Sequence, residues 1–134
     1  EKFNLDTLRD RKLKILPHSI IQAARIARTL ASQCEITLFD NPDIFLNINQ
    51  IKQFFRNIKK HAAAGRNSVI LASGNINFLT NICDRILILD KGEIVEDKLP
   101  EEISAELLKS IFNTDLIMVK NIVTGKNEFQ IIEE

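Results

Sequence analysis

The sequence predicts an α/β fold in which a mainly parallel sheet is flanked by helices and a hairpin closes the C-terminal end. Two observations support this fold class. Short apolar runs of high β-propensity alternate with segments whose apolar residues recur at helical spacing. The runs are also unbroken, which is typical of strands buried on both faces, as in a parallel sheet.

The first of these runs, Ile36–Phe39, is followed directly by Asp40, Asn41 and Pro42. Pro42 cannot donate a hydrogen bond to a ladder, so the strand is predicted to end there. Asp40 then lies at the carboxyl end of a strand, where open α/β sheets place their ligands. A buried strand capped by a polar turn explains the same residues, so the remaining elements have to decide between the two readings.

The composition indicates one globular domain or part of one. The chain has 134 residues, 45% of them hydrophobic, and a formal net charge of zero. Balanced charge gives no electrostatic reason to expect a nucleic acid partner. No apolar run approaches the roughly 20 residues of a membrane span. Because the chain begins with Glu1 rather than Met, we expect it to come from a longer product. Cys34 and Cys83 lack metal-ligand spacing and are expected to be buried thiols in a reducing compartment.

The first elements in chain order are a lead-in and a helix. Glu1–Lys14 is expected to be charged and weakly helical. Pro17 and Ser19 then predict a helix start, with Ser19 as the N-cap. The helical spacing of small and apolar residues continues to Gln33, and it is followed by the strand described above.

A second helix is predicted from the spacing of apolar residues between Ile48 and Ile58. It ends in a run of cations, which suit the negative end of a helix, and Gly65 is its expected stop. His61 belongs to this run and is expected to be a surface residue that compensates the helix dipole rather than a metal ligand.

The second half of the chain continues the alternation. Ser68–Ser73 is predicted to be a buried strand, Asn75–Ile82 a short helix and Arg85–Asp90 a third strand. The turn Lys91–Gly92 and the return strand Glu93–Val95 then complete a hairpin.

The C-terminal segment is predicted to contain one helix and one hairpin. The helix opens at Pro100, which suits a first helical position, and runs through Phe112. The strands Leu116–Val119 and Glu128–Ile132 form the hairpin across the turn Thr124–Asn127.

This order of elements resembles the C-terminal half of an ATP-binding cassette (ABC) transporter ATPase, a P-loop NTPase fold. Ile36–Pro42 is similar to the family's Walker B strand, which ends in Asp-Glu-Pro. Cys83–Leu89 and Lys91–Val95 are similar to its run of Cys-Asp-Arg, a buried strand and a glycine hairpin. The tail Pro100–Ile132 resembles importer ATPases that serve siderophores, haem or cobalamin. The degenerate motifs leave an exporter or a type I secretion cassette open as well.

The resemblance implies one partial domain over residues 1–134. Residues 1–34 would be a remnant of the helical subdomain with the signature helix, residues 35–97 half of the catalytic core, and residues 98–134 the C-terminal helix and hairpin.

Compared with the family pattern, this chain lacks catalytic side chains at several positions after the Walker B strand. Asp40 stands at the aspartate position associated with Mg²⁺, a cation that prefers carboxylates. Asn41 stands at the position of the catalytic glutamate, and its carboxamide cannot serve as a general base, which is typically worth about a hundred- to ten-thousand-fold in rate. Gly74 stands at the switch histidine position and Asn47 at the D-loop aspartate position. No catalytic residue is therefore expected to be intact.

The signature segment, Leu-Ser-Gly-Gly-x-x-Gln in the family, is degenerate here. The matching nucleotide-binding positions hold Leu16, Pro17, His18, Ser19 and Gln22. A proline replaces a hydroxyl, and side chains replace two glycines that let backbone N–H groups approach phosphate. The P-loop motif is absent from the chain. The resemblance thus implies ATP and Mg²⁺ for the parent protein and neither for this chain alone.

The resemblance also implies a missing strand. In the family, the strand that carries the P-loop lies between the strands matched by Ser68–Ser73 and Arg85–Leu89. Without it both strands would expose unpaired backbone groups. Three solutions are open: the N-terminal half belongs to the natural protein, the two strands pair directly, or a second chain supplies the strand as in a homodimer through sheet edges.

Three functions follow from these observations. The first is a degenerate ATP-binding subunit or domain of an ABC transporter that is non-hydrolytic alone and acts as a structural or regulatory partner. The second is a fragment of a working ABC ATPase whose P-loop half lies outside this chain, and the third is an interaction module without a nucleotide role. The expected partners are a transmembrane subunit and a second nucleotide-binding domain, and the expected location is the cytoplasm or the cytoplasmic face of a membrane.

Overall fold

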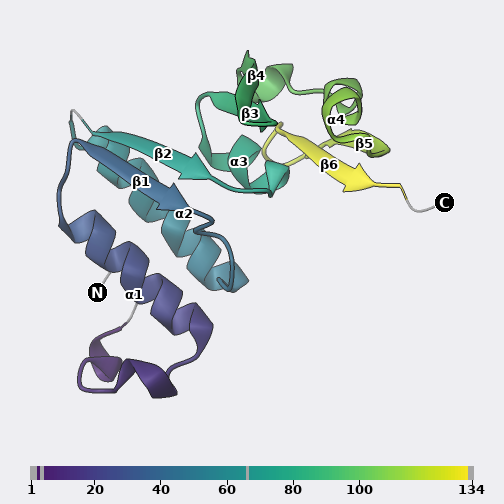
Figure 1. The fold of residues 1–134 in the computed structure, drawn as a ribbon. Coiled ribbons are helices and arrows are strands. Elements are labelled where there is room, and N and C mark those ends of the chain that lie inside the picture. The colour runs from purple at the N-terminus through teal and green to yellow at the C-terminus, as the bar shows by residue number, and fades with distance from the viewer. Residues whose placement is uncertain (1–2, 4, 66, 133–134) are drawn as a thin grey trace. The chain divides into compact units, whose positions relative to one another are not determined.

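The computed structural model describes residues 3, 5–65 and 67–132 and forms two compact units, Glu1–Gly74 and Asn75–Glu134 (Figure 1). Each unit contains helices and strands, so the predicted α/β class is confirmed. Residues 1, 2 and 4 of the predicted lead-in Glu1–Lys14 lie outside the described residues. Whether the two units belong to a single domain stays a prediction.

The first unit is a two-stranded parallel sheet with two helices. After the 3₁₀ turns η1 (Asp6–Leu8) and η2 (Leu13–Ile15) come α1, β1, α2 and β2. Their bounds are His18–Ala31 for α1, Ile36–Asp40 for β1, Ile48–Ala63 for α2 and Ser68–Ala72 for β2. The two strands pair in parallel along their whole length, from Ile36 opposite Ser68 to Asp40 opposite Ala72.

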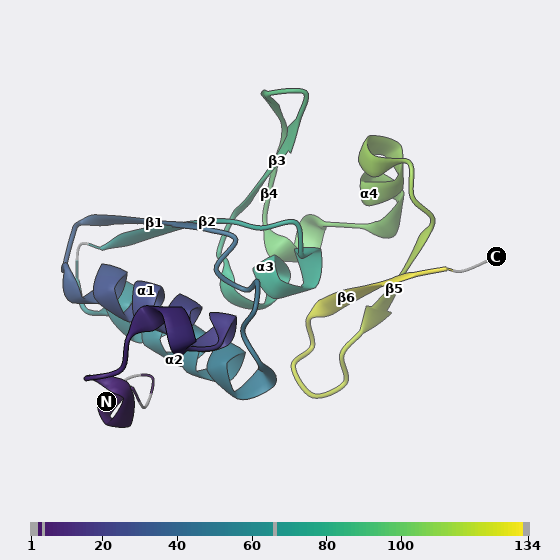
Figure 2. The same ribbon diagram turned by 60° about the horizontal axis from the view of Figure 1, so that its bottom comes forward.

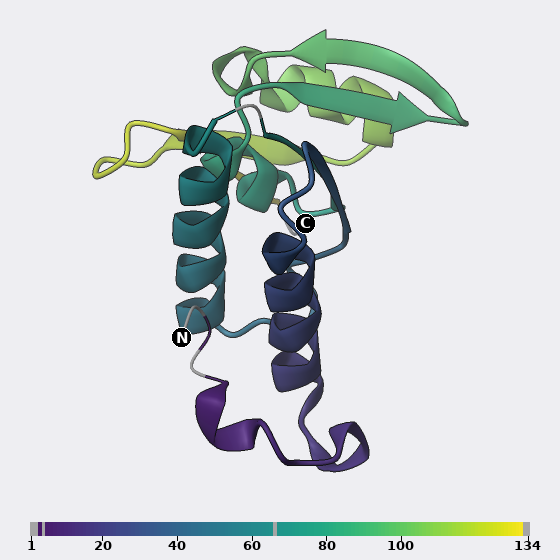
Figure 3. The same cartoon turned by 90° about the vertical axis from the view of Figure 1, so that its left-hand side faces the viewer.

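Both helices of this unit cover the same face of the sheet, as Figure 2 shows, and they run side by side in Figure 3. Phe39 on that face is buried and meets Phe54 of α2 edge to face, with 5.6 Å between ring centroids. The buried apolar residues of the two helices are Ala23, Ile26, Leu30, Phe54 and Ile58. The core of the unit therefore lies between the helices and one face of the strands.

The prediction that these strands are buried on both faces is wrong for this chain. Leu38 is 67% exposed and Ile70 56% exposed, whereas Thr37 and Phe39 are buried. Side chains alternate between the faces of a strand, and in this unit the helices cover only one face. The second face is apolar in sequence and exposed in structure.

Helix α1 begins differently from the prediction. Pro17 is the N-cap residue, without a side-chain hydrogen bond, and His18 is the first helical residue. Ser19 lies inside the first turn, so its assignment as the N-cap is wrong. Proline suits a helix start because its φ of −56° is already close to helical and its missing N–H would have had no partner there.

Helix α2 is held at its start by a reciprocal pair of side chains. Asn47 Oδ1 accepts a hydrogen bond from the backbone N–H of Gln50 (3.0 Å), and Gln50 Oε1 accepts one from the N–H of Asn47 (3.0 Å). This capping box satisfies two N–H groups that an isolated helix leaves unpaired. The helix ends at Ala63, and Gly65 follows with a φ of +143°, in agreement with the predicted stop.

The second unit contains two antiparallel hairpins and two helices. Its elements are α3 (Ile76–Ile82), β3 (Ile86–Asp90), β4 (Glu93–Lys98), η3 (Pro100–Glu102), α4 (Ala105–Phe112), β5 (Leu116–Lys120) and β6 (Asn127–Ile131). The predicted helix over Pro100–Phe112 is split, because Ser104 accepts a hydrogen bond from Leu107 N–H (3.1 Å) and starts a new helix there. One cluster of buried residues in the second unit consists of Ile86, Ile88, Ile103, Leu108 and Phe129, and Phe78 and Ile82 of α3 are buried as well.

The described strands form three separate two-stranded sheets. Only β1 and β2 are parallel, whereas β3 pairs with β4 and β5 with β6 in antiparallel register. Strand β2 pairs with β1 and strand β3 with β4, each pair within its own unit, and the alternative in which β2 and β3 pair directly stays a prediction. The chain turns back at Lys91 and Gly92, both with positive φ, and this supplies β3 with β4 as its partner.

Candidate functional site

The candidate site lies at the carboxyl end of β1. Asp40 is its last residue, is exposed and stands opposite Ala72 of β2. The backbone N–H of Asn41 donates to the carbonyl of Ala72 (2.8 Å), which extends the ladder one bond beyond Asp40. The turn that follows is therefore attached to both strands.

Asn41 adopts a left-handed backbone conformation with a φ of +45°. Asparagine tolerates this region better than most residues. Its side-chain Nδ2 donates a hydrogen bond to Asp40 Oδ1 (3.0 Å). The amide thus engages one oxygen of the neighbouring carboxylate, and it presents no group that can take a proton from water.

The degenerate signature segment contacts this turn through Gln22 of α1. Gln22 Nε2 donates to the carbonyl of Asn41 (3.3 Å) and lies 3.5 Å from the carbonyl of Pro42. Pro42 is buried, so the turn is packed as well as hydrogen bonded.

The other signature positions lie at the N-terminal end of α1. Leu16 is half-buried and Pro17 is exposed. The exposed ring of His18 stacks on Phe45, with 5.2 Å between centroids and 29° between planes. The carbonyl of Ser19 accepts a hydrogen bond from Gln50 Nε2 (3.3 Å).

Two further predicted positions are Asn47 and Gly74. Asn47 is the N-cap of α2, and its side-chain oxygen accepts a hydrogen bond from the backbone N–H of Gln50. Gly74 follows β2, and a Cβ added there would meet no heavy atom within 4 Å. Steric crowding therefore does not explain the glycine, and a larger side chain would fit at this position.

Sequence reasoning missed a contact that joins the two strand ends. Ser73 Oγ donates to Asp43 Oδ1 (2.8 Å), and both side chains are half-buried. Nothing in the residue pattern predicts this pair, because it depends on the register of β1 and β2. Gln50 was also missed, although the spacing Asn47-x-x-Gln50 before an apolar segment is a recognisable capping box.

The donor set limits how a metal would be held. Within residues 3, 5–65 and 67–132 no group of three or more His, Cys, Asp or Glu side chains is placed to hold a metal ion. Magnesium is commonly bound by one or two carboxylates together with substrate phosphates. At the predicted metal position, Asp40 supplies one exposed carboxylate at the end of β1.

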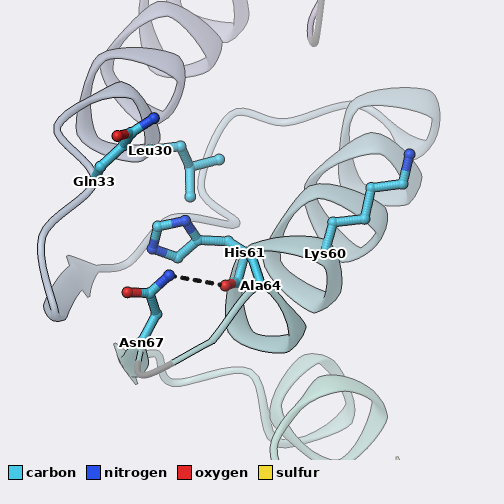
Figure 4. A pocket seen from close by; sticks show the side chains of 6 residues that line it. All are labelled: Leu30, Gln33, Lys60, His61, Ala64 and Asn67. Atoms are coloured by element: carbon cyan, nitrogen blue, oxygen red, sulfur yellow. Dashed lines mark hydrogen bonds between the residues drawn. The ribbon is translucent and has the colours of Figure 1, made fainter.

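A cavity of about 460 Å³ lies elsewhere in the first unit, between the C-terminal ends of α1 and α2 (Figure 4). It is lined by Leu30, Gln33, Lys60, His61, Ala64 and Asn67, none of which is a predicted nucleotide or metal position. His61 is half-buried there, and its Nε2 lies 3.4 Å from Oγ1 of the buried Thr37. The expectation of a purely surface-exposed His61 is therefore wrong, because the ring turns toward β1.

The two cysteines differ in environment. Cys34 is exposed, so the prediction of a buried thiol is wrong for this residue, whereas Cys83 is half-buried. Burial, together with the charge of Asp84, raises the pKa of the Cys83 thiol to about 11, although Lys126 opposes the rise.

We expect iodoacetamide at pH 8 to modify Cys34 first. At that pH the Cys83 thiol, with a pKa of about 11, is only about 0.1% thiolate and is half-buried, whereas Cys34 is exposed to the reagent. Mass spectrometry of timed samples measures both rates, and Cys34→Ser identifies the fast site. Equal modification of both cysteines in the folded protein would contradict the assigned burial.

None of the described helices combines the length and the apolar character that a membrane span needs. No family model matches the chain.

The similar curated proteins are ATP-binding proteins of ABC transporters. The chain is 36% identical over 81 residues to the arginine transport ATP-binding protein ArtM of Bacillus subtilis, covering 60% of this chain and 33% of that protein. It is 30% identical over 114 residues to the petrobactin import ATP-binding protein FpuC of Bacillus anthracis, covering 84% of this chain and 42% of that protein. The chain thus spans about a third to two fifths of the length of these relatives.

Solved structures agree on the fold. An inward-facing ABC transporter of metal-chelate type superposes with a TM-score of 0.81 at 20% identity, covering 98% of this chain and 53% of that one. The RNase-L inhibitor superposes with a TM-score of 0.75 at 19% identity, covering 99% of this chain and 26% of that one. The curated relatives show that the chain is similar to part of an ABC transporter ATP-binding protein, and the solved structures show that it shares the ABC ATPase fold.

Proposed function

We propose that this chain belongs to an ATP-binding subunit or domain of an ABC transporter that does not hydrolyse ATP by itself. The observation that carries the proposal is the pair of residues at the end of β1, where Asn41 donates to Asp40 and offers no base. A carboxylate at this position would polarise the attacking water, whereas a carboxamide has no basic oxygen at neutral pH.

The surrounding positions support the same proposal. Gly74 supplies no side chain where the family resemblance implies a histidine, and the space around it is empty. Pro17, His18 and Ser19 replace the serine and the two glycines of the signature, so backbone N–H groups are less accessible to phosphate. All these changes remove groups that would contact a nucleotide.

The proposed role is that of a structural or regulatory partner. It would pair with a second nucleotide-binding domain and with a transmembrane subunit, at the cytoplasmic face of a membrane. ATP and Mg²⁺ would be ligands of the parent protein, with Asp40 toward the metal, and not of this chain alone. Among the described strands β1 and β2 pair only with each other, so their open sheet edges also leave a homodimer as a further partner.

Phosphate release by the whole natural protein tests this function. We expect the unmodified protein and its Asp40→Ala variant to give the same rate, equal to the spontaneous hydrolysis of Mg-ATP. The variant is the matched control, because it removes the carboxylate at the metal position while leaving the signature segment intact. Turnover in the unmodified protein that Asp40→Ala abolishes would reject the proposal.

A second candidate is a fragment of a working ABC ATPase whose P-loop half lies outside this chain. The observation that favours it is the coverage of only 33% to 42% of the curated relatives. In that case the whole protein binds Mg-ATP and hydrolyses it despite Asn41. Calorimetric titration separates binding from turnover, so heat with turnover favours this candidate, and the absence of turnover favours the first proposal.

A further inference from the structure

We propose that Asn41 is a positioning residue that fixes the turn after β1 and holds the Asp40 carboxylate in place. The inference deepens the proposed function and rests on it for its biological meaning, since the sequence assigns Asn41 only a lost catalytic role. In the structure the residue uses its N–H, its side chain and its carbonyl together.

The backbone of Asn41 has an unusual conformation that keeps the two strands paired. Its φ of +45° lies in the left-handed region, where a Cβ is normally unfavourable. Asparagine and glycine are the residues that enter this region most readily. The N–H of Asn41 points at the carbonyl of Ala72 (2.8 Å), so the unusual conformation keeps the last rung between β1 and β2.

The side chain of Asn41 holds the neighbouring carboxylate. Nδ2 of Asn41 donates to Asp40 Oδ1 at 3.0 Å, a hydrogen bond to an ionised acceptor. A glutamate at position 41 has no donor to replace it and would place a second negative charge beside Asp40. Glutamate is also less suited to a positive φ.

The backbone carbonyl of Asn41 accepts two hydrogen bonds. It accepts from Gln22 Nε2 (3.3 Å) of α1 and from the backbone N–H of Ile44 (3.3 Å). The turn is thereby joined to the signature helix as well as to both strands. Asn41 is thus the residue at which the strand end, the signature helix and the metal-position carboxylate meet.

Nuclear magnetic resonance of the 134-residue chain tests the side-chain bond. The Asn41 side-chain amide protons should resonate downfield of exposed asparagine amides such as that of Asn49. The isosteric variant Asp40→Asn, which removes the charged acceptor, should move the Asn41 signal upfield while leaving Asn49 unchanged. An Asn41 signal that does not respond to Asp40→Asn would overturn the proposal.

Amide hydrogen exchange tests the backbone part with a matched pair of variants. Asn41→Gly and Asn41→Ala both delete the carboxamide, but only glycine is free to keep a positive φ. We expect the amide of residue 41 to exchange about fivefold faster or more in Asn41→Ala than in Asn41→Gly. Asn41→Glu should resemble Asn41→Ala. Equal exchange in the glycine and alanine variants would overturn the assignment.

These measurements need neither nucleotide nor turnover. A hydrolytic parent protein would reject the proposed function and leave the positioning role standing, whereas an unresponsive Asn41 amide would reject the positioning role alone.

Discussion

Replacement of Phe54 by alanine is expected to destabilise the first unit by about 3–5 kcal/mol. Phe54 has no exposed surface, and its ring meets Phe39 of β1 edge to face. Removing it leaves a cavity between α2 and the strand that carries Asp40. Denaturant unfolding followed by circular dichroism gives the change in free energy of unfolding.

The control lies in the same helix. Ile48 is 85% exposed, so Ile48→Ala should change the stability by no more than about 0.5 kcal/mol. If Phe54→Ala is no more destabilising than Ile48→Ala, the packing of α2 against β1 is not the core of this unit.

The second large effect is expected in the second unit, where Asn77→Ala should cost about 2–4 kcal/mol. Asn77 Oδ1 accepts from the backbone N–H of Phe129 (2.8 Å), and its Nδ2 donates to the carbonyl of the same residue (2.8 Å). The side chain of Asn77 on α3 thus pairs both backbone groups of Phe129 on the outer edge of β6. Its removal leaves a donor and an acceptor without partners, each costing roughly 1–3 kcal/mol when buried.

Denaturant unfolding and hydrogen exchange at the Phe129 amide measure this effect. Gln130→Ala is the matched control, because it deletes an exposed side-chain amide from the next residue of the same strand. Asn77→Asp should fall between the wild-type protein and Asn77→Ala, since a carboxylate can accept from the Phe129 N–H but cannot donate to the carbonyl. If Asn77→Ala and Gln130→Ala lower the free energy of unfolding equally, the two hydrogen bonds between Asn77 and Phe129 do not stabilise this unit.

Local patterns in the sequence were sufficient to predict most elements. The run Ile36–Phe39 before Asp40 and Pro42 predicted the strand β1 and its end, and the spacing from Ile48 to Ile58 predicted α2. Strand β2, the parallel neighbour of β1, was predicted from its unbroken run of apolar residues. These signals are strong because they depend on the residues of one segment only.

Other features depend on contacts between segments and were out of reach. The hydrogen bond between Ser73 and Asp43 forms only when β1 and β2 pair in the observed register. The hydrogen bonds between Asn77 and Phe129 form only when α3 lies against β6. The exposure of Leu38 and Ile70 also cannot be read from an unbroken apolar run, because it depends on which layers cover the sheet. The start of α1 was misplaced because Ser19 and Pro17 both favour helix starts.

The site illustrates the same division. Sequence reasoning identified Asp40 and Asn41 as neighbours at a strand end, and the geometry agrees. It assigned Asn41 only a missing carboxylate, because a left-handed φ and a bond to Asp40 are conformational facts that residue types do not reveal.

We infer that the turn after β1 retains the carboxylate at the metal position but lacks a base for hydrolysis. Steady-state phosphate release from Mg-ATP by the whole natural protein tests it most directly. We expect a rate of phosphate release that Asp40→Ala does not change. A rate well above that of spontaneous hydrolysis, lowered by Asp40→Ala, would overturn this inference.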